Sequence, residues 1–464
     1  MKQQIERPEE EIQQTKLVEI LILLAICLGY FMVILDATVV NVALPNVQQQ
    51  LGGTVNELQW IVDGYLLVFA CVLLTGGALG DRLGNKHIFV VGLVLFTSAS
   101  ALCGLAPNLW VLQIARVLQG LGAALQVPTS LALLNHSFHD PRERARAIGV
   151  WGGIAGIAAA SGPVLGGLLV NWLSWRSVFI LNVPIGILAM LLTMRYVAAV
   201  PALPQRGLDL GAQATSLIAL ALLTLVFIQG KVWGWTSLPI LGALVVFVLA
   251  TVSFILIEQR SRGPMLPLEL FGSRTFSASN TVGFLVNFAF YGQLFFINLF
   301  FQNIWGFSAL LAGLATLPES GFVALSSFLS GRVTAHTGPR MPMLIGLLVG
   351  GIAFLVTMLV NERTAYLLLC PMLVGMGFGI SFTMPAMTTA VIASAPKERS
   401  GIASGVLNAS RQVGSALGVA LLGSLVSQRS TFVAGMHSAL AIAGSAFLCG
   451  ALVTLLFVKP GHNR

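Results

Sequence analysis

The chain has 464 residues, of which 56% are hydrophobic and only 9% are charged, with a formal net charge of +8 and a mean hydropathy of +0.88. A soluble domain carries roughly 25% charged residues. This composition therefore excludes a water-soluble fold and indicates an integral membrane protein.

Apolar runs of about 20 residues, long enough to cross a bilayer as a helix, recur along the chain. The N-terminus is polar and acidic and lacks a signal-peptide pattern, so we expect the first run to be retained as a span. The fourteen predicted spans are residues 17–43, 58–79, 87–106, 109–134, 147–171, 177–198, 211–229, 238–258, 275–301, 309–331, 341–360, 364–385, 401–426 and 436–458. We therefore predict an all-α polytopic membrane protein.

The basic residues are distributed unevenly between the predicted loops. Alternate loops, including both termini, hold nineteen Lys and Arg residues, whereas the other loops hold only Arg176, Lys231, Arg363 and Arg429. Because cytoplasmic loops are enriched in Lys and Arg, we expect both termini to be cytoplasmic. This distribution also explains the net charge without a nucleic-acid partner.

Two short motifs recur at nearly the same separation. Residues 141–144 (PRER) reappear at 396–399 (PKER), and the loop 77–86 (GALGDRLGNK) has an echo at 331–340 (GRVTAHTGPR). Repeated halves around a central site are typical of secondary transporters, and a channel or a membrane enzyme gives no reason to expect them. The predicted segments are a cytoplasmic segment 1–16, a six-helix bundle 17–198, a linker 199–274 with two extra spans, a second bundle 275–458 and a tail 459–464.

Three acidic residues lie well inside predicted spans, namely Asp36, Asp63 and Glu319. A charge in hydrocarbon is costly, so each invites a functional hypothesis. A carboxyl group in apolar surroundings can exchange a proton near neutral pH. We expect Asp36 and Glu319 to carry protons, and all three acids to act as counter-charges for a cation. The alternative is that they only bond neighbouring helices.

Arg116, in the fourth span, needs an acidic or carbonyl partner and is predicted to tune a nearby carboxyl group; structural bracing is the alternative. Arg411, in span 13, presents the same ambiguity. Aromatic residues of the second and ninth spans are predicted to line a binding cavity, or alternatively to pack against lipid or in the core. The candidates are Trp60, Phe288 and Tyr291.

Two glycine-rich segments suggest conformational roles. The loop after the second span, with Gly77, Asp81, Arg82, Gly84 and Lys86, is predicted to be a cytoplasmic latch whose basic residues face the C-terminal end of that span. The fifth span is predicted to pack closely against a neighbour or to act as a hinge. Its residues for this role are Gly149, Gly162, Pro163, Gly166 and Gly167.

Other chemistries lack their motifs. No Walker A sequence is present, so ATP is not the evident energy source, and the five cysteines form no CxxC pair. We expect no cofactor and no metal. A membrane enzyme would need a clustered nucleophile, metal ligands or a reactive His–acid pair, and the sequence contains none of these.

These motifs resemble those of the major facilitator superfamily over essentially the whole chain. GALGDRLGNK is similar to the loop signature of that superfamily, with Asn85 at a usually basic position. LQIARVLQGLGAA (112–124) is similar to the motif whose arginine is linked to proton coupling. Residues 162–167 are similar to the antiporter motif. That motif extends to the position of Ala158, where it prefers glycine.

LDATVVNVALP, WRSVFILNVPIG and the fourteen spans resemble the drug:proton antiporter family with fourteen spans, and WIVDGY resembles exporters of quaternary ammonium compounds. The resemblance implies a monomer in the bacterial cytoplasmic membrane that exchanges protons for lipophilic, cationic compounds. The alternative is a proton-coupled exporter of a specific metabolite or an anionic compound. In that case Arg116 or Arg411 would bind the substrate.

Overall fold

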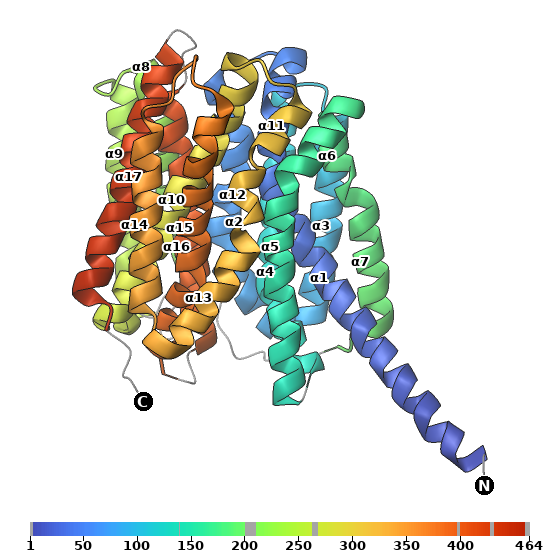
Figure 1. The fold of residues 1–464 in the computed structure, drawn as a ribbon. Coiled ribbons are helices and arrows are strands. Elements are labelled where there is room, and N and C mark those ends of the chain that lie inside the picture. The colour runs from blue at the N-terminus through green and yellow to red at the C-terminus, as the bar shows by residue number, and fades with distance from the viewer. Residues whose placement is uncertain are drawn as a thin grey trace.

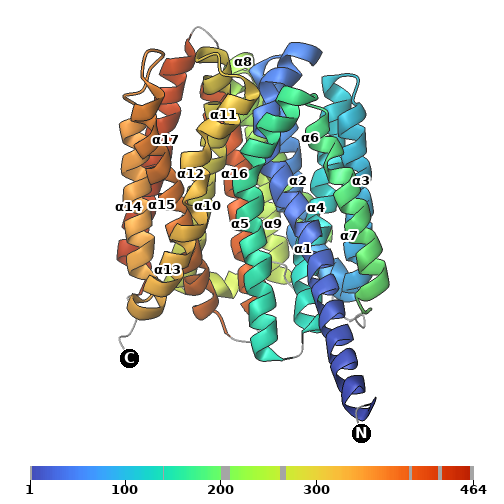
Figure 2. The ribbon, with the colours of Figure 1, turned by 45° about the vertical axis from the view of Figure 1, so that its right-hand side comes forward.

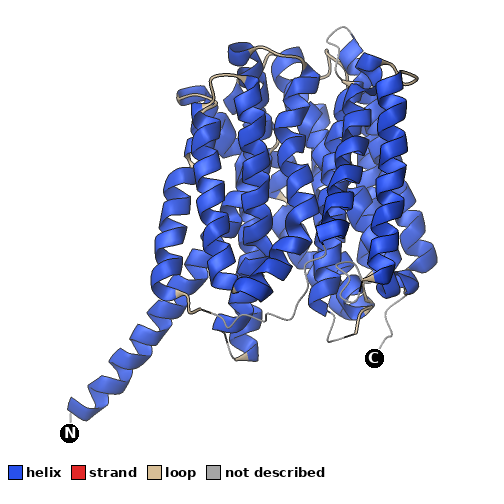
Figure 3. Ribbon diagram, turned by 180° about the vertical axis from the view of Figure 1, so that it is seen from behind, coloured by secondary structure: helices blue, strands red, loops and turns tan. Residues whose placement is uncertain are grey.

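The computed structural model describes residues 3–138, 140–199, 210–261, 268–396, 400–426 and 431–459. Within these ranges the chain forms helices joined by short turns and loops, with no strand (Figure 3). The helices before residue 200 are α1 (Gln3–Leu51), α2 (Val55–Leu83), α3 (Asn85–Leu105), α4 (Leu109–Ser137), α5 (Pro141–Trp172), α6 (Ser177–Ile180) and α7 (Asn182–Tyr196).

The remaining described helices complete the bundle. They are α8 (Leu210–Trp233), α9 (Leu238–Arg260), the 3₁₀ turn η1 (Leu268–Gly272), α10 (Arg274–Leu299), the π-helical turn η2 (Phe300–Ile304), α11 (Ala309–Ala315), α12 (Leu317–Gly321), α13 (Val323–Thr337), α14 (Arg340–Thr357), α15 (Tyr366–Ala393), α16 (Ser400–Leu425) and α17 (Phe432–Phe457). The sixth predicted span is divided between α6 and α7, the ninth ends in η2, and the tenth is broken into α11, α12 and α13.

Fourteen spans are confirmed when these broken spans are counted as units. Thirteen of the described stretches are long and apolar enough to cross a membrane. The fourteenth is α16, which is less apolar because it carries Asn408, Arg411 and Gln412. It lies inside the bundle, packed against α10 and α2, so its polar residues are shielded from lipid.

Two groups of helices lie side by side, α1–α7 in one half and α10–α17 in the other (Figures 1 and 2). The halves meet where α2 packs on α16, α1 on α10, and α5 on α11 and α12. The start of α1 and the end of α17 lie at the same end of the bundle (Figure 1). The predicted first span is shorter than α1, which begins at Gln3, because the preceding Gln, Glu and Lys residues are good helix formers.

The two inserted helices have different surroundings. Asn56 Nδ2 on α2 donates to the carbonyl of Ile228 on α8 at 2.6 Å, and Gln213 Nε2 donates to the carbonyl of Cys71 at 2.8 Å. Helix α8 also packs on α16, so it touches both halves. Helix α9 packs mainly on α8 and leaves a row of large apolar side chains exposed, as expected for contact with lipid.

The loop repeat recurs as a structural repeat. Gly84 and Gly338 end α2 and α13 with φ of +95° and +76°, values that favour glycine. Lys86 Nζ donates to the carbonyl of Met194 at the end of α7 at 3.2 Å, and Arg340 donates to the carbonyl of Leu455 at the end of α17. Both halves therefore anchor their last helix in the same way. The other repeat, of residues 141–144 at 396–399, has no structural counterpart to compare, because residues 397–399 lie outside the described ranges.

Candidate functional site

Asp36, on α1, is the centre of a buried polar network in the N-terminal half. Its side chain is fully buried, as is that of Arg116 on α4, with which it forms an ion pair. Asp36 Oδ1 also accepts hydrogen bonds from Gln119 Nε2 at 3.1 Å and Asn182 Nδ2 at 3.0 Å. Gln119 donates in addition to Ser100 Oγ at 2.7 Å. The network therefore ties together α1, α3, α4 and α7.

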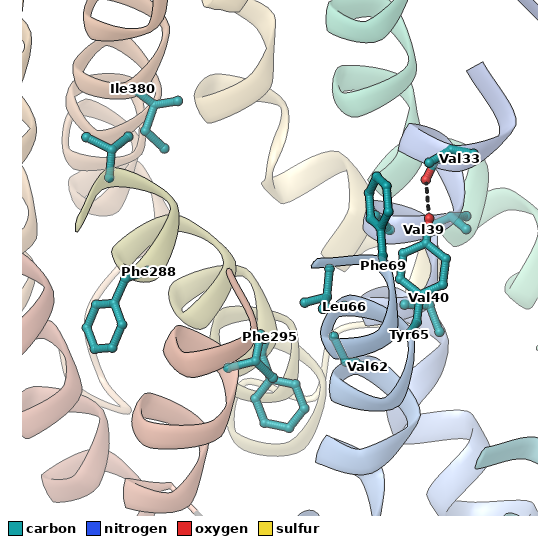
Figure 4. Packing of buried hydrophobic residues seen from close by; sticks show 14 of the residues in the cluster. Val33, Val39, Val40, Val62, Tyr65, Leu66, Phe69, Phe288, Phe295 and Ile380 are labelled. Atoms are coloured by element: carbon teal, nitrogen blue, oxygen red, sulfur yellow. Dashed lines mark hydrogen bonds between the residues drawn. The ribbon is translucent and has the colours of Figure 1, made fainter. Parts of the chain in front are cut away.

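Arg116 is held by a second helix and by an aromatic face. Its Nε donates to the carbonyl of Ile61 on α2 at 2.8 Å, and its Nη1 donates to Gln119 Oε1 at 2.8 Å. The guanidinium carbon lies 4.3 Å from the centre of the Tyr65 ring. Tyr65 is fixed in turn because its hydroxyl donates to the carbonyl of Val33 at 3.0 Å (Figure 4).

The Asp36 carboxylate is thus satisfied by three donors, all of them buried. Taking an ion pair out of water is costly, and further hydrogen bonds to both partners offset that cost. Loss of the negative charge on Asp36 would leave Arg116 without a counter-charge. The charge of Asp36 therefore contributes directly to the contacts that hold α1 against α4 and α7.

Sequence reasoning singled out Asp36 and Arg116 but missed their partners Ser100, Gln119 and Asn182. These residues are uncharged, so the rarity of intramembrane charges does not point to them. A search for Asn and Gln in apolar spans would have found Gln119, three residues after Arg116, and Asn182 within an apolar run.

Glu319 lies between the two halves rather than in this network. It is on α12, the short middle piece of the tenth span, which has Pro318 in its first turn. The Glu319 side chain lines a cavity of about 30 Å³, together with Thr38 of α1, Pro163 of α5 and Phe290 of α10. That volume has room for a water molecule or two.

The Glu319 carboxyl group is only partly satisfied. One oxygen accepts a hydrogen bond from Gln293 Nε2 at 3.3 Å, and the other has no partner within the described part of the chain. Helix α15 approaches closely here, since a Cβ at Gly377 would overlap the Glu319 backbone. The backbone of Glu319 is therefore held in place by α15, and one oxygen of its carboxyl group remains unbonded beside the cavity.

Asp63 makes no hydrogen bond or ion pair with the other two acids in the described part of the chain. It is fully buried on α2, and neither carboxyl oxygen has a hydrogen-bond partner among the described residues. One turn earlier, Gln59 Nε2 donates to the carbonyls of Val419 and Ala420 on α16 at 3.0 and 3.1 Å. Asp63 is four positions after Gln59, so it shares the side of α2 that faces the C-terminal half.

The loop after α2 forms the tight turn that its glycines predicted. Gly77 and Asp81 are half-buried in the last turns of α2, and Gly84 supplies the positive φ. Arg82 lies in the last turn of α2, as predicted. The prediction for Lys86 was wrong, because it bonds the end of α7 rather than the end of α2. Its long side chain reaches across to the neighbouring helix.

The glycines of α5 fall into two groups. A Cβ at Gly162 would overlap Thr38 on α1, and one at Gly166 would lie 3.0 Å from Val39. Across the halves, a Cβ at Gly167 would lie 2.7 Å from the carbonyl oxygen of Ala309 on α11. Gly149 has no such neighbour within 4 Å. Close packing therefore belongs to the part of α5 around Pro163.

The predicted aromatic residues differ in their burial and in their neighbours. Trp60 is half-buried on α2. Phe288 is buried and stacks on Phe284, with ring centres 6.1 Å apart, whereas its neighbour Phe290 lines the Glu319 cavity. Tyr291 is half-buried and lies within electrostatic reach of Arg411.

Comparison with curated proteins identifies relatives along nearly the whole chain. The chain is 38% identical to a methylenomycin A resistance protein of Bacillus subtilis, covering 97% of both chains. It is 38% identical to the multidrug resistance protein Stp of Mycobacterium tuberculosis, covering 88% of this chain and 76% of the relative. It is 36% identical to a tetracenomycin C resistance and export protein of Streptomyces glaucescens, with the same two coverages.

Solved structures with the same fold include an auto-inhibited peptide transporter of the POT family and a bacterial homologue of the human lysosomal transporter Spinster. The first has a TM-score of 0.69 at 16% identity, over 96% of this chain and 98% of that chain. The second has a TM-score of 0.61 at 18% identity, over 94% and 95%. The sequence model of the Major Facilitator Superfamily matches residues 26–419 and 280–464. The chain belongs to the Major Facilitator Superfamily, and its curated relatives are drug and antibiotic resistance proteins.

Proposed function

We propose that the protein is a proton-coupled antiporter that exports small lipophilic compounds, cations among them, across the bacterial cytoplasmic membrane. The observation that carries the proposal is the buried Asp36–Arg116 ion pair, held by donors from several helices of one half. Burying a charge pair inside the membrane is costly in free energy, so such a pair indicates a function, which we propose to be a change of protonation. The relatives are named as drug resistance and export proteins, which supports outward transport of drugs.

Helix α1 connects this ion pair with the interface between the halves. Asp36 points into the N-terminal network, while Thr38, two residues later, lines the cavity beside Glu319. A compound or a proton that arrives at Glu319 would therefore act on the same helix that carries Asp36. Glu319 is the better placed of the two acids to meet a cation, because Asp36 is already saturated with donors.

Transport would proceed by rocking of residues 17–198 against residues 275–458, with 199–274 as the linker between them. We propose a monomer with both termini in the cytoplasm. The charge distribution of the loops supports this orientation, as does the position of the start of α1 and the end of α17 at one end of the bundle (Figure 1).

The test is transport of a fluorescent lipophilic cation into inside-out vesicles under an imposed pH gradient. The wild-type protein is expected to accumulate the cation only while the gradient lasts, and Asp36→Asn and Glu319→Gln are each expected to abolish accumulation. Glu362→Gln, at an exposed loop residue, is the matched carboxyl-to-amide control. Accumulation that persists without a gradient, or in Asp36→Asn, would overturn the proposed coupling.

The alternative cargo, an anionic compound, depends on an arginine that is free to meet it. Arg116 is not free, because Asp36 neutralises it. Arg411 has no carboxylate partner among the described residues, so of these two arginines it is the one available to bind an anionic compound.

A further inference from the structure

Arg411 is a cation inside the bundle whose bonding is incomplete. It is half-buried near the middle of α16, the helix that packs on both α2 and α10. Its Nη1 lies 3.4 Å from Asn408 Oδ1, and its Nε has no hydrogen-bond partner in the described part of the chain. No ion pair of the described residues includes it. A guanidinium in such a position normally has an acidic or carbonyl partner.

Two tyrosines, one from each half, lie within range of the charge of this cation. Arg411 acts electrostatically on Tyr291 of α10 and on Tyr30 of α1. The Tyr30 ring lies flat on that of Trp151 of α5, with ring centres 3.9 Å apart and planes 7° apart. Trp151 is itself oriented, because its Nε1 donates to Ser130 Oγ at 3.2 Å. All three rings are half-buried, although they lie well inside their helices.

None of the three intramembrane acids Asp36, Asp63 and Glu319 pairs with Arg411 within the described ranges. Asp36 is bonded to Arg116, Gln119 and Asn182. Glu319 bonds Gln293 beside its own cavity, and Asp63 makes no hydrogen bond or ion pair within the described ranges. The described part of the chain thus supplies a partly accessible cation without an anion to neutralise it. A ligand that brings a carboxylate would complete the pair.

We propose that Arg411, Asn408, Tyr30 and Tyr291 form a subsite for the acidic group of a planar, aromatic carboxylic acid, with the Tyr30–Trp151 pair beside its ring. A guanidinium presents parallel N–H groups that match the two oxygens of a carboxylate. Tyrosine hydroxyls can donate to the same oxygens, and stacked rings provide a flat apolar wall. This inference rests on the proposed function, because it names a second class of cargo for the same exporter.

The experiment measures binding of naphthalene-2-carboxylate to the purified full-length protein in detergent by titration calorimetry. Naphthalene-2-carboxamide, a neutral probe of nearly the same shape, is the reference ligand. The wild-type protein is expected to bind the acid at least about tenfold more tightly than the amide. Arg411→Gln is expected to reduce the ratio of the two affinities to about one. Arg411→Lys is expected to give an intermediate ratio, because lysine keeps the positive charge but lacks the parallel N–H groups of arginine.

Arg363→Gln, in an exposed loop, is the matched control and is expected to keep the wild-type ratio. Binding of the amide to Arg411→Gln establishes that the variant is folded; if that variant does not fold, the intermediate ratio in Arg411→Lys decides the matter. Equal affinity for acid and amide in the wild type, or a ratio that Arg411→Gln leaves unchanged, would overturn the subsite.

The two proposals fail in different ways. Binding in detergent needs no gradient, so it tests the subsite alone. If the acid binds in an Arg411-dependent manner but neither the acid nor a cation moves with a pH gradient in vesicles, the subsite stands and proton-coupled export fails. If cations are exported but the acid does not bind, the export proposal stands and the subsite fails.

Discussion

At the scale of single residues, the Asp36–Arg116 pair combines two opposing requirements. Both charges are fully buried, which destabilises each alone, and each is the main compensation for the other. Removing one partner of a buried pair commonly costs about 3–5 kcal/mol because the remaining charge is uncompensated, whereas removing both costs less. The pair is therefore expected to behave as one unit in folding.

We predict that Asp36→Asn and Arg116→Gln each destabilise the protein by about 3–5 kcal/mol, and that the double variant is more stable than the sum of the single effects implies. Denaturant-induced unfolding of the four purified proteins measures this coupling as a double-mutant cycle. Glu362→Gln, exposed in a loop, serves as the control and should be neutral. Strictly additive effects would contradict a direct pairing.

The sequence predicted which charges matter but not how they are paired. Asp36 and Arg116 stand out because charges are rare in apolar spans, yet 80 positions separate them along the chain. Their contact depends on the rotation of α1 and α4 about their axes, which no local pattern specifies. The same holds for Glu319 and Asp63. Both were predicted to share a cation site with Asp36, and no hydrogen bond or ion pair within the described ranges connects the three acids.

At the scale of elements, α5 shows that only some glycines of a glycine-rich helix pack against a neighbouring helix. Around Pro163 its glycines touch α1 and α11, so the helix serves both its own half and the interface. Near its start, Gly149, Gly152 and Gly153 have no atom within 4 Å of an added Cβ. The sequence predicted a glycine-rich packing helix, but the spacing alone could not tell which glycines meet a neighbour.

We predict that Gly162→Ala destabilises the protein by about 1–3 kcal/mol through overpacking against Thr38 and strongly reduces export. Gly149→Ala is the matched change on the same helix, and it is expected to be neutral or stabilising by up to about 1 kcal/mol, because alanine favours helix. Thermal unfolding in detergent and vesicle transport measure the two effects. Equal effects at both positions would exclude contact with α1 as the reason for the glycine.

At the scale of the whole molecule, hydropathy and the repeat were sufficient to predict fourteen spans in two halves. Membrane crossings follow from length and apolarity, and a repeated loop implies a repeated bundle. The packing partners of the inserted helices could not be predicted, because hydropathy carries no information on neighbours. Helix α8 bonds α2 through Asn56 and Gln213 and also touches α16, so it lies against both halves.

If the two halves rock against each other, a covalent link between them should stop transport. Asn46 at the end of α1 and Gln302 in η2 belong to opposite halves, and their side chains lie 3.5 Å apart. We predict that Asn46→Cys/Gln302→Cys, in a variant without the five native cysteines, loses nearly all export after treatment with a short thiol cross-linker that reductant can cleave. Reductant should restore export.

The matched control links α1 to its own half at the same end of the molecule. Gln50 and Arg176 lie 3.3 Å apart between their side chains, so Gln50→Cys/Arg176→Cys should form the cross-link without loss of export. Mass spectrometry of the linked peptides establishes that both links have formed. Rocking predicts inhibition only for the first pair, because only that link joins bodies that must separate. Full export by the linked Asn46→Cys/Gln302→Cys protein would show that the halves need not part at this position.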